Sequence, residues 1–171
     1  MKRLFLTIFL TLLSVGCGDD VSQPTDYEIA QMYNAAWEAM GWFDKTTMPI
    51  EWQNDELYHR VVHDTIGTFA ELEAHLLSIF AADIVSRLLH DSRYRDIDGV
   101  LHARAADRGS NLFAGGEVHE IIRVSDYEII YRVSVDIYGY DLVTLSEIEV
   151  SDFRLILWDG NWVFGNFHMV R

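Results

Sequence analysis

Apolar residues recur every three or four positions near the start of the predicted domain, which is the spacing of one face of an amphipathic helix. Thr25 and Glu28 stand three residues apart where this pattern begins, as in a capping box, and Gly41 follows its last turn. We therefore expect a helix over residues 26–40 with Gly41 as its C-cap. The residues expected to pack on a sheet are Ile29, Met32, Tyr33, Ala36, Trp37 and Met40.

A second capping box predicts a second helix. Thr68 is followed three residues later by Glu71, and the apolar residues that continue the helical spacing are Leu72, Leu76, Ile79 and Phe80. The apolar residues within 83–89 indicate a third, short helix. Between the first two helices, residues 41–56 have no clear period, and residues 57–62 alternate weakly, as in a short strand.

In the second half of the chain the apolar period changes to alternation, which is typical of half-buried strands. Residues 99–104 are a candidate strand. Residues 118–124 and 128–138 are expected to form a hairpin around Ser125 and Asp126. The residues expected on one face of its second strand are Ile129, Tyr131, Val133, Val135 and Ile137.

Asp159-Gly160 is a strong signal for a two-residue hairpin turn, and it predicts strands over 147–158 and 161–170. Within the first of these strands the apolar residues change parity, which a strand cannot do without an extra residue. We therefore predict a β-bulge near Ser151-Asp152. The residues of one parity are Ile148 and Val150, and those of the other are Phe153, Leu155 and Leu157.

The order of these elements predicts an α+β fold. We expect N-terminal helices packed on the concave face of a curved, mainly antiparallel C-terminal β-sheet. This arrangement would be cystatin-like or NTF2-like in general shape.

The chain begins with Lys2 and Arg3, and residues 4–13 are apolar apart from two threonines. This is the pattern of a secretory signal peptide, and the apolar run is too short to cross a bilayer as a stable anchor. We therefore expect residues 1–16 to be a signal peptide and the remaining chain to act outside the cytoplasm.

Cys17 is the only cysteine. Ser14-Val15-Gly16-Cys17 resembles the lipobox of bacterial lipoproteins, although the usual leucine stands one place early, at Leu13. We expect a lipid on Cys17 and a polar tether over residues 17–25, which would anchor the protein at the extracytoplasmic face of the cell membrane. The alternative is an ordinary signal peptide followed by a free cysteine.

The chain is strongly acidic. Its net charge is −14, and removal of residues 1–16 deletes two basic residues, which leaves 27 acidic against 11 basic side chains and a net charge of −16. Such a charge opposes binding to nucleic acid or to anionic lipid head groups. It favours a cationic protein partner, or it serves solubility alone. The many aromatic residues indicate one folded domain over residues 26–171.

No catalytic or metal-binding pattern stands out in the sequence. His59 and His63 have the spacing of a zinc-binding pair on a helix. However, the segment between them is predicted to be a strand, and no acidic third ligand stands at a matching position. No serine lies in a G-x-S-x-G elbow, and Gly115-Gly116 lacks the rest of a phosphate-binding loop. We therefore expect no cofactor, no metal and no catalytic residue, and a protein that is not an enzyme.

Two connections are longer than a hairpin needs, and they cover residues 105–117 and 139–146. Binding residues concentrate in long loops held by a rigid sheet. Each loop is therefore a candidate binding loop, and the alternative for each is a solvated connector.

An ordered set of short segments runs through the domain: Asp64-Thr65-Ile66, Phe69-Ala70-Glu71-Leu72-Glu73, Ile79-Phe80, Ile84-Val85, Leu88-Leu89, Arg93-Tyr94-Arg95-Asp96-Ile97-Asp98-Gly99, Ala106-Asp107-Arg108-Gly109-Ser110-Asn111 and Gly160-Asn161-Trp162-Val163-Phe164. Together these segments resemble the IseA family, which are inhibitors of cell-wall DL-endopeptidases from Gram-positive bacteria. The similarity covers about residues 27–171, and no single motif in it is specific.

The resemblance implies a non-enzymatic protein that blocks peptidoglycan hydrolases of the NlpC/P60 type by covering the catalytic cleft with an acidic, loop-bearing surface. Those hydrolases are cysteine peptidases that cut D-glutamyl links in stem peptides. The candidate partner-binding residues are Asp107, Arg108 and Glu117 in the first loop, and Tyr138, Tyr140 and Asp141 at the second.

A second interpretation comes from the same element order. Cystatin-like and NTF2-like cones often enclose a pocket for a small ligand or a reaction. A deep cavity lined by polar residues such as Arg132, Asp136 and His119 would favour this interpretation, and a filled apolar interior would count against it. A structural accessory domain of the cell envelope is a third possibility.

Overall fold

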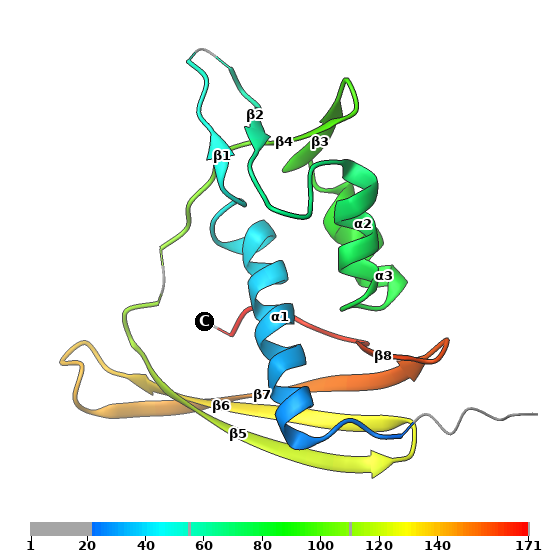
Figure 1. Cartoon of the computed structure of the whole chain (residues 1–171). Coiled ribbons are helices and arrows are strands. Elements are labelled where there is room, and N and C mark those ends of the chain that lie inside the picture. The colour runs from blue at the N-terminus through cyan, green and yellow to red at the C-terminus, as the bar shows by residue number, and fades with distance from the viewer. Residues whose placement is uncertain (1–21, 55, 110, 171) are drawn as a thin grey trace, which may run out of the picture.

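The computed structural model describes residues 22–54, 56–109 and 111–170, so the expected signal peptide and Cys17 lie outside the described residues. The described part of the chain has an α+β fold (Figure 1). Its helices are α1 (Asp26–Asp44), α2 (Phe69–Leu77) and α3 (Ala82–His90). Its strands are β1 (Ile50–Glu51), β2 (His59–Val61), β3 (Tyr94–Ile97), β4 (Val100–Ala103), β5 (Ala114–Ser125), β6 (Glu128–Tyr138), β7 (Leu145–Trp158) and β8 (Asn161–Phe164).

The strands form two separate antiparallel sheets, whereas the sequence pattern predicts one. The small sheet has the order β1-β2-β4-β3, and the large sheet has the order β5-β6-β7-β8. Figure 1 shows the two sheets near opposite ends of α1. The hydroxyl of Tyr94 in β3 ties the small sheet to the end of α1, because it donates to the Trp42 carbonyl (3.2 Å) and accepts from the Met48 amide (3.0 Å).

Helix α1 begins where the sequence predicts it. The Thr25 hydroxyl accepts from the Glu28 amide, and the Glu28 carboxylate accepts from the Thr25 amide, so the capping box is confirmed. The prediction of Gly41 as the C-cap is wrong. Burial of Trp42 and Phe43 extends the helix past the glycine, and the C-cap is Lys45, whose amide donates to the Gly41 carbonyl (2.8 Å).

The second capping box, Thr68 with Glu71, is also confirmed at the start of α2. Ile79 and Phe80 lie beyond the end of α2 instead of on its apolar face. The Ile79 carbonyl accepts from the Phe164 amide (2.9 Å), which ties the segment between α2 and α3 to β8 of the large sheet. Helix α3 is one residue longer at each end than predicted.

Both predicted hairpins are present in the large sheet. The β5–β6 pair turns at Asp126 and Tyr127, and the β7–β8 pair turns at Asp159 and Gly160. The φ angles of Asp159 and Gly160 are 48° and 77°, as expected for the left-handed two-residue turn that favours an Asp-Gly pair. The strand predicted over 161–170 ends early, at Phe164.

The predicted β-bulge near Ser151-Asp152 is absent from the pairing of β6 with β7. The register runs without interruption from Glu128 opposite Ile156 to Ile137 opposite Glu147. The bulge prediction fails because Ile148 and Val150 stay on the open face of the sheet, where they are 55% and 54% exposed. Apolar residues of both parities therefore fit one unbroken strand.

Helix α1 rises from one face of the large sheet toward the small sheet (Figure 1), and aromatic side chains pack between its N-terminal half and the large sheet. The rings of Tyr33 and Tyr131 are 4.7 Å apart, and those of Phe153 and Phe167 are stacked at 4.6 Å. The four side chains are buried, so this end of the core is an aromatic layer between helix and sheet.

No described element covers the opposite face of the large sheet. Glu120, Arg132 and Asp152 form a row across its strands β5, β6 and β7. The Arg132 Nε lies 2.7 Å from an Asp152 oxygen, and its Nη1 lies 3.6 Å from a Glu120 oxygen. Solvent-exposed charged pairs of this kind suit a face that stays in water. Among the described helices, none is long and apolar enough to span a bilayer.

Candidate partner-binding surface

The connection between β6 and β7 is a tight hairpin tip over residues 139–144. The Asp141 carboxylate accepts hydrogen bonds from the Thr144 hydroxyl (2.6 Å), the Thr144 amide (2.9 Å) and the Val143 amide (3.1 Å). These hydrogen bonds lower the pKa of Asp141 to about 2, and the bond from the Thr144 hydroxyl contributes most. The Gly139 amide also donates to the Thr144 carbonyl (2.8 Å), so the tip has a defined shape.

Large apolar side chains at this tip face solvent. Tyr140 is 96% exposed, and the ring of Phe113 contacts it edge-on with centroids 5.5 Å apart. We call the exposed set around this contact the tip patch, and it consists of Leu112, Tyr140, Leu142 and Val143. Exposed apolar residues that gather at one projecting loop mark an interaction site more often than scattered ones do.

The loop that leads into β5 supports the hairpin tip. The Tyr138 amide donates to the Phe113 carbonyl (2.8 Å). At Gly115, a Cβ atom would lie 2.6 Å from Cε2 of Tyr138 and 3.2 Å from the carbonyl oxygen of Asp136. Glycine is therefore needed at position 115 for the Tyr138 ring to lie over β5.

Asp107 and Arg108 are fixed against the end of α1. The Arg108 guanidinium donates to Asp44 (2.8 Å), and its amide donates to the Lys45 carbonyl (3.1 Å). The Asp107 carboxylate accepts from the Thr46 hydroxyl (3.0 Å). Both residues therefore hold the loop in place, and both remain exposed.

Glu117 lies apart from the hairpin tip, on the side of β5 that faces α1. Its carboxylate is 3.5 Å from Nε2 of His119. Burial, together with the charge of Glu117, raises the pKa of Tyr33. Glu117 and Arg108 line one groove of about 400 Å³, with Trp37, Lys45, Met169 and other residues.

The six predicted contact residues thus fall into two groups at one end of the large sheet. Tyr140 and Asp141 lie in the hairpin tip and Tyr138 ends the strand that leads into it, whereas Arg108 and Glu117 line the groove beside the start of β5, with Asp107 next to Arg108. Phe113 joins the two groups, because its ring contacts Tyr140 and its carbonyl accepts from the Tyr138 amide.

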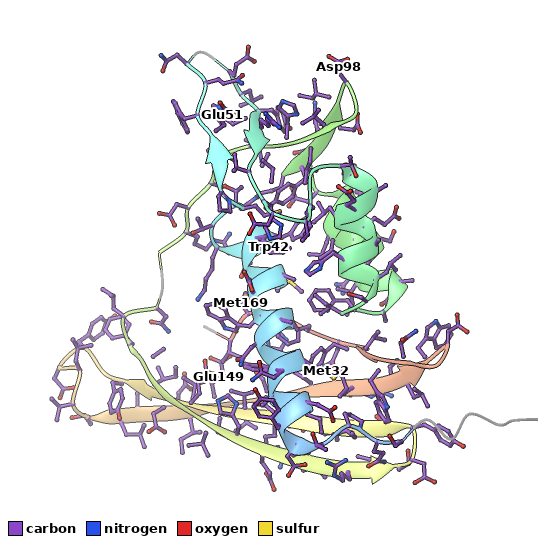
Figure 2. All side chains as sticks on the ribbon, in the orientation of Figure 1. Met32, Trp42, Glu51, Asp98, Glu149 and Met169 are labelled. Carbon is purple, nitrogen blue, oxygen red and sulfur yellow. The ribbon has the colours of Figure 1, made fainter. Side chains whose placement is uncertain are left out.

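A larger groove was not predicted from the sequence. It has a volume of about 600 Å³ and lies between α1, α3, β7 and the C-terminal segment. Figure 2 labels two of its lining residues, Glu149 on the sheet and Met169 beside α1. Arg87, Asp91 and His168 also line this groove. These residues come from segments far apart in the sequence, and no local pattern joins them.

The residues proposed for an internal polar cavity do not meet. Arg132 and Asp136 lie on the open face of the large sheet, because they pair with Asp152 and Ile148. His119 lies on the other face, with its ring 5.5 Å from that of Tyr33. The space under α1 is filled by the aromatic layer.

The rings of His59 and His63 contact different tryptophans, Trp52 and Trp42. His59 is buried, stacks on Trp52 with ring centroids 4.2 Å apart, and accepts from the Gln53 amide through Nδ1 (3.2 Å). In the part of the chain that the structure describes, no cluster of three or more His, Cys, Asp or Glu residues could hold a metal ion.

No protein-family model matches this chain, and no curated protein matches it. The resemblance to the IseA family therefore stays a prediction from the sequence.

Proposed function

We propose that this protein is a lipid-anchored, extracytoplasmic inhibitor of a peptidoglycan DL-endopeptidase of the NlpC/P60 type. In this proposal the β6–β7 hairpin tip and the loop before β5 cover the catalytic cleft of the hydrolase. The observation that carries the proposal is the tip patch, in which Tyr140 is almost fully exposed on a hairpin that projects from the sheet.

The tip is suited to enter a cleft because its shape is set before binding. Asp141 fixes the turn, and Phe113 supports the Tyr140 ring. A preformed loop loses less conformational entropy on binding than a flexible one. Large aromatic residues with a polar end are frequent energetic centres of protein interfaces.

Charge would act mainly on the rate of encounter. The chain has a net charge of −14, and Asp107, Glu117 and Asp141 lie at or beside the proposed contact. A hydrolase with a basic cleft rim would be attracted at low ionic strength, and salt would slow association. The apolar tip patch would then set how long the complex lasts.

Inhibition by contact needs no chemistry from this chain. A cysteine peptidase whose cleft is filled cannot reach the D-glutamyl link of a stem peptide. A lipid on Cys17 would keep the inhibitor near the membrane, where exported hydrolases emerge.

The test is a digestion assay with purified residues 18–171, which lack the expected signal peptide and Cys17. We expect this protein to slow peptidoglycan digestion by an NlpC/P60 endopeptidase at stoichiometric ratios and low salt. Unchanged digestion with several such enzymes would remove the proposal. A muramidase that cuts the glycan strand serves as the control, and its rate should not change.

A further inference from the structure

The N-terminal segment is bound at one end of the large sheet. The Gln23 side chain donates to the Ser125 carbonyl (2.6 Å) at the β5–β6 turn. The Arg123 guanidinium donates to the Gln23 side chain (2.9 Å) and to the Pro24 carbonyl (3.0 Å), and it pairs with Asp26. The chain therefore enters the domain beside the β5–β6 turn.

Exposed apolar side chains lie at the same end of the sheet. Tyr127 occupies the β5–β6 turn and is 68% exposed, and Trp158 ends β7 and is 67% exposed. The Leu157 amide donates to the Tyr127 carbonyl (3.0 Å), which places the β5–β6 turn beside the end of β7 that carries Trp158. Figure 1 shows the β5–β6 turn, the β7–β8 turn and the incoming chain on one side of the molecule.

We call this set the anchor-end surface, and it consists of Leu77, Val124, Tyr127 and Trp158. Leu77, at the end of α2, lines a shallow depression with Trp158. Tyrosine and tryptophan are enriched at the head-group level of membranes, because their rings are apolar and carry one polar group.

Arginines offset part of the acidity at this end. Asp26 pairs with Arg123, and the Glu128 carboxylate accepts from Nε of Arg154 (2.7 Å). The chain as a whole has 27 acidic residues against 13 basic ones, so this pairing lowers repulsion where it occurs. Because these arginines are paired with carboxylates, contact with a membrane would depend on the aromatic side chains.

We propose that the anchor-end surface lies against the bilayer, with Tyr127 and Trp158 at the level of the lipid head groups. This inference rests on the proposed lipid anchor at Cys17. Five residues separate Cys17 from Gln23, and at roughly 3.3–3.6 Å per residue the covalent chain allows a reach of about 20 Å at most. An acylated Cys17 must therefore hold the β5–β6 end close to the membrane.

This orientation directs the tip patch away from the membrane. The tip is at the other end of β6, which has 11 residues and is therefore roughly 35 Å long. The tether and the sheet would together present the hairpin tip to hydrolases in the wall-side space, and the hydrolase would not compete with the bilayer for the same surface.

The test uses the lipoprotein produced in a host that acylates it, with the lipid on Cys17 confirmed by mass spectrometry. The protein is reconstituted in phosphatidylcholine vesicles with and without lipids brominated near the head group, which quench tryptophan emission on contact. Trp52 gives a matched control, because it is 66% exposed but follows β1 in the small sheet. The variants are Trp158→Tyr and Trp52→Tyr, and circular dichroism checks their fold.

We expect brominated lipid to reduce the emission of the unmodified protein. Most of this loss should disappear in Trp158→Tyr and persist in Trp52→Tyr. The orientation is overturned if the acylated protein shows no loss, or if the loss disappears in Trp52→Tyr instead. An unacylated Cys17 would overturn the anchor and the orientation together, while the inhibition assay with residues 18–171 would still stand on its own.

Discussion

The ring of Phe113 meets the ring of Tyr140 edge-on, with centroids 5.5 Å apart and planes at 83°. Phe113 belongs to the loop before β5, and Tyr140 belongs to the β6–β7 hairpin tip. Two loops that are separate in the sequence thus form one surface.

The first prediction concerns two adjacent glycines. In Gly115→Ala the new methyl group would overlap the Tyr138 ring, and we expect a loss of about 1–2 kcal/mol in the free energy of unfolding, as for other overpacked sites. Gly116→Ala is the matched control, because a Cβ atom at position 116 meets nothing within 4 Å. Urea denaturation measures both. Equal stabilities of the two variants would contradict the placement of Tyr138 over β5.

The second prediction concerns the turn at Asp141. Its folded-state pKa of about 2 is below the ordinary value of 3.8, so its contribution to the order of the tip is complete above about pH 4 and is lost as the pH falls through 2. At neutral pH, Asp141→Asn should speed hydrogen exchange at the amides of Val143 and Thr144. The exchange of amides in β6 should not change. Unaltered exchange at both tip amides would show that the carboxylate does not hold the turn.

The third prediction tests the unbroken register of β7. Phe153 is fully buried and stacks on Phe167, so Phe153→Ala should cost about 3–5 kcal/mol in the free energy of unfolding. Val150→Ala should change it by less than about 0.5 kcal/mol, because Val150 is on the open face. Denaturation curves compare the two variants. A large loss in Val150→Ala would instead favour the bulged strand.

Elements with a local signal were predictable from the sequence. The capping boxes at Thr25 and Thr68 and the turn at Asp159-Gly160 depend on side chains within four residues of the feature they specify. Alternation along residues 128–138 predicted β6 with its correct bounds and its buried face.

Features that depend on contacts between residues far apart in the sequence were not predictable from local patterns. Gly41 continues α1 because Trp42 and Phe43 are buried by residues remote in sequence. Strands β1 and β3 have two and four residues, and they exist through pairing with β2 and β4. The even-numbered positions of Ile148 and Val150 suggested a bulge only on the assumption that both side chains are buried. The sequence does not tell that their face of the sheet is open to solvent.

The candidate surface was predictable in part. Loop length indicated both loops, and the hairpin tip holds two of the six predicted residues, Tyr140 and Asp141. The bond between Arg108 and Asp44 joins residues 64 positions apart and has no local signature. The contact of Phe113 with Tyr140 joins residues 27 positions apart and likewise has no local signature.

The most direct test of the proposed inhibition is the inhibition constant of Tyr140→Ala against an NlpC/P60 endopeptidase that residues 18–171 inhibit. Tyr127→Ala is the matched control, since Tyr127 is also exposed but is at the other end of the sheet. We predict that Tyr140→Ala weakens inhibition by about 2 kcal/mol or more, which is roughly 30-fold, and that Tyr127→Ala leaves it unchanged. Equal inhibition by the two folded variants would contradict the assignment of the hairpin tip as the contact with the hydrolase.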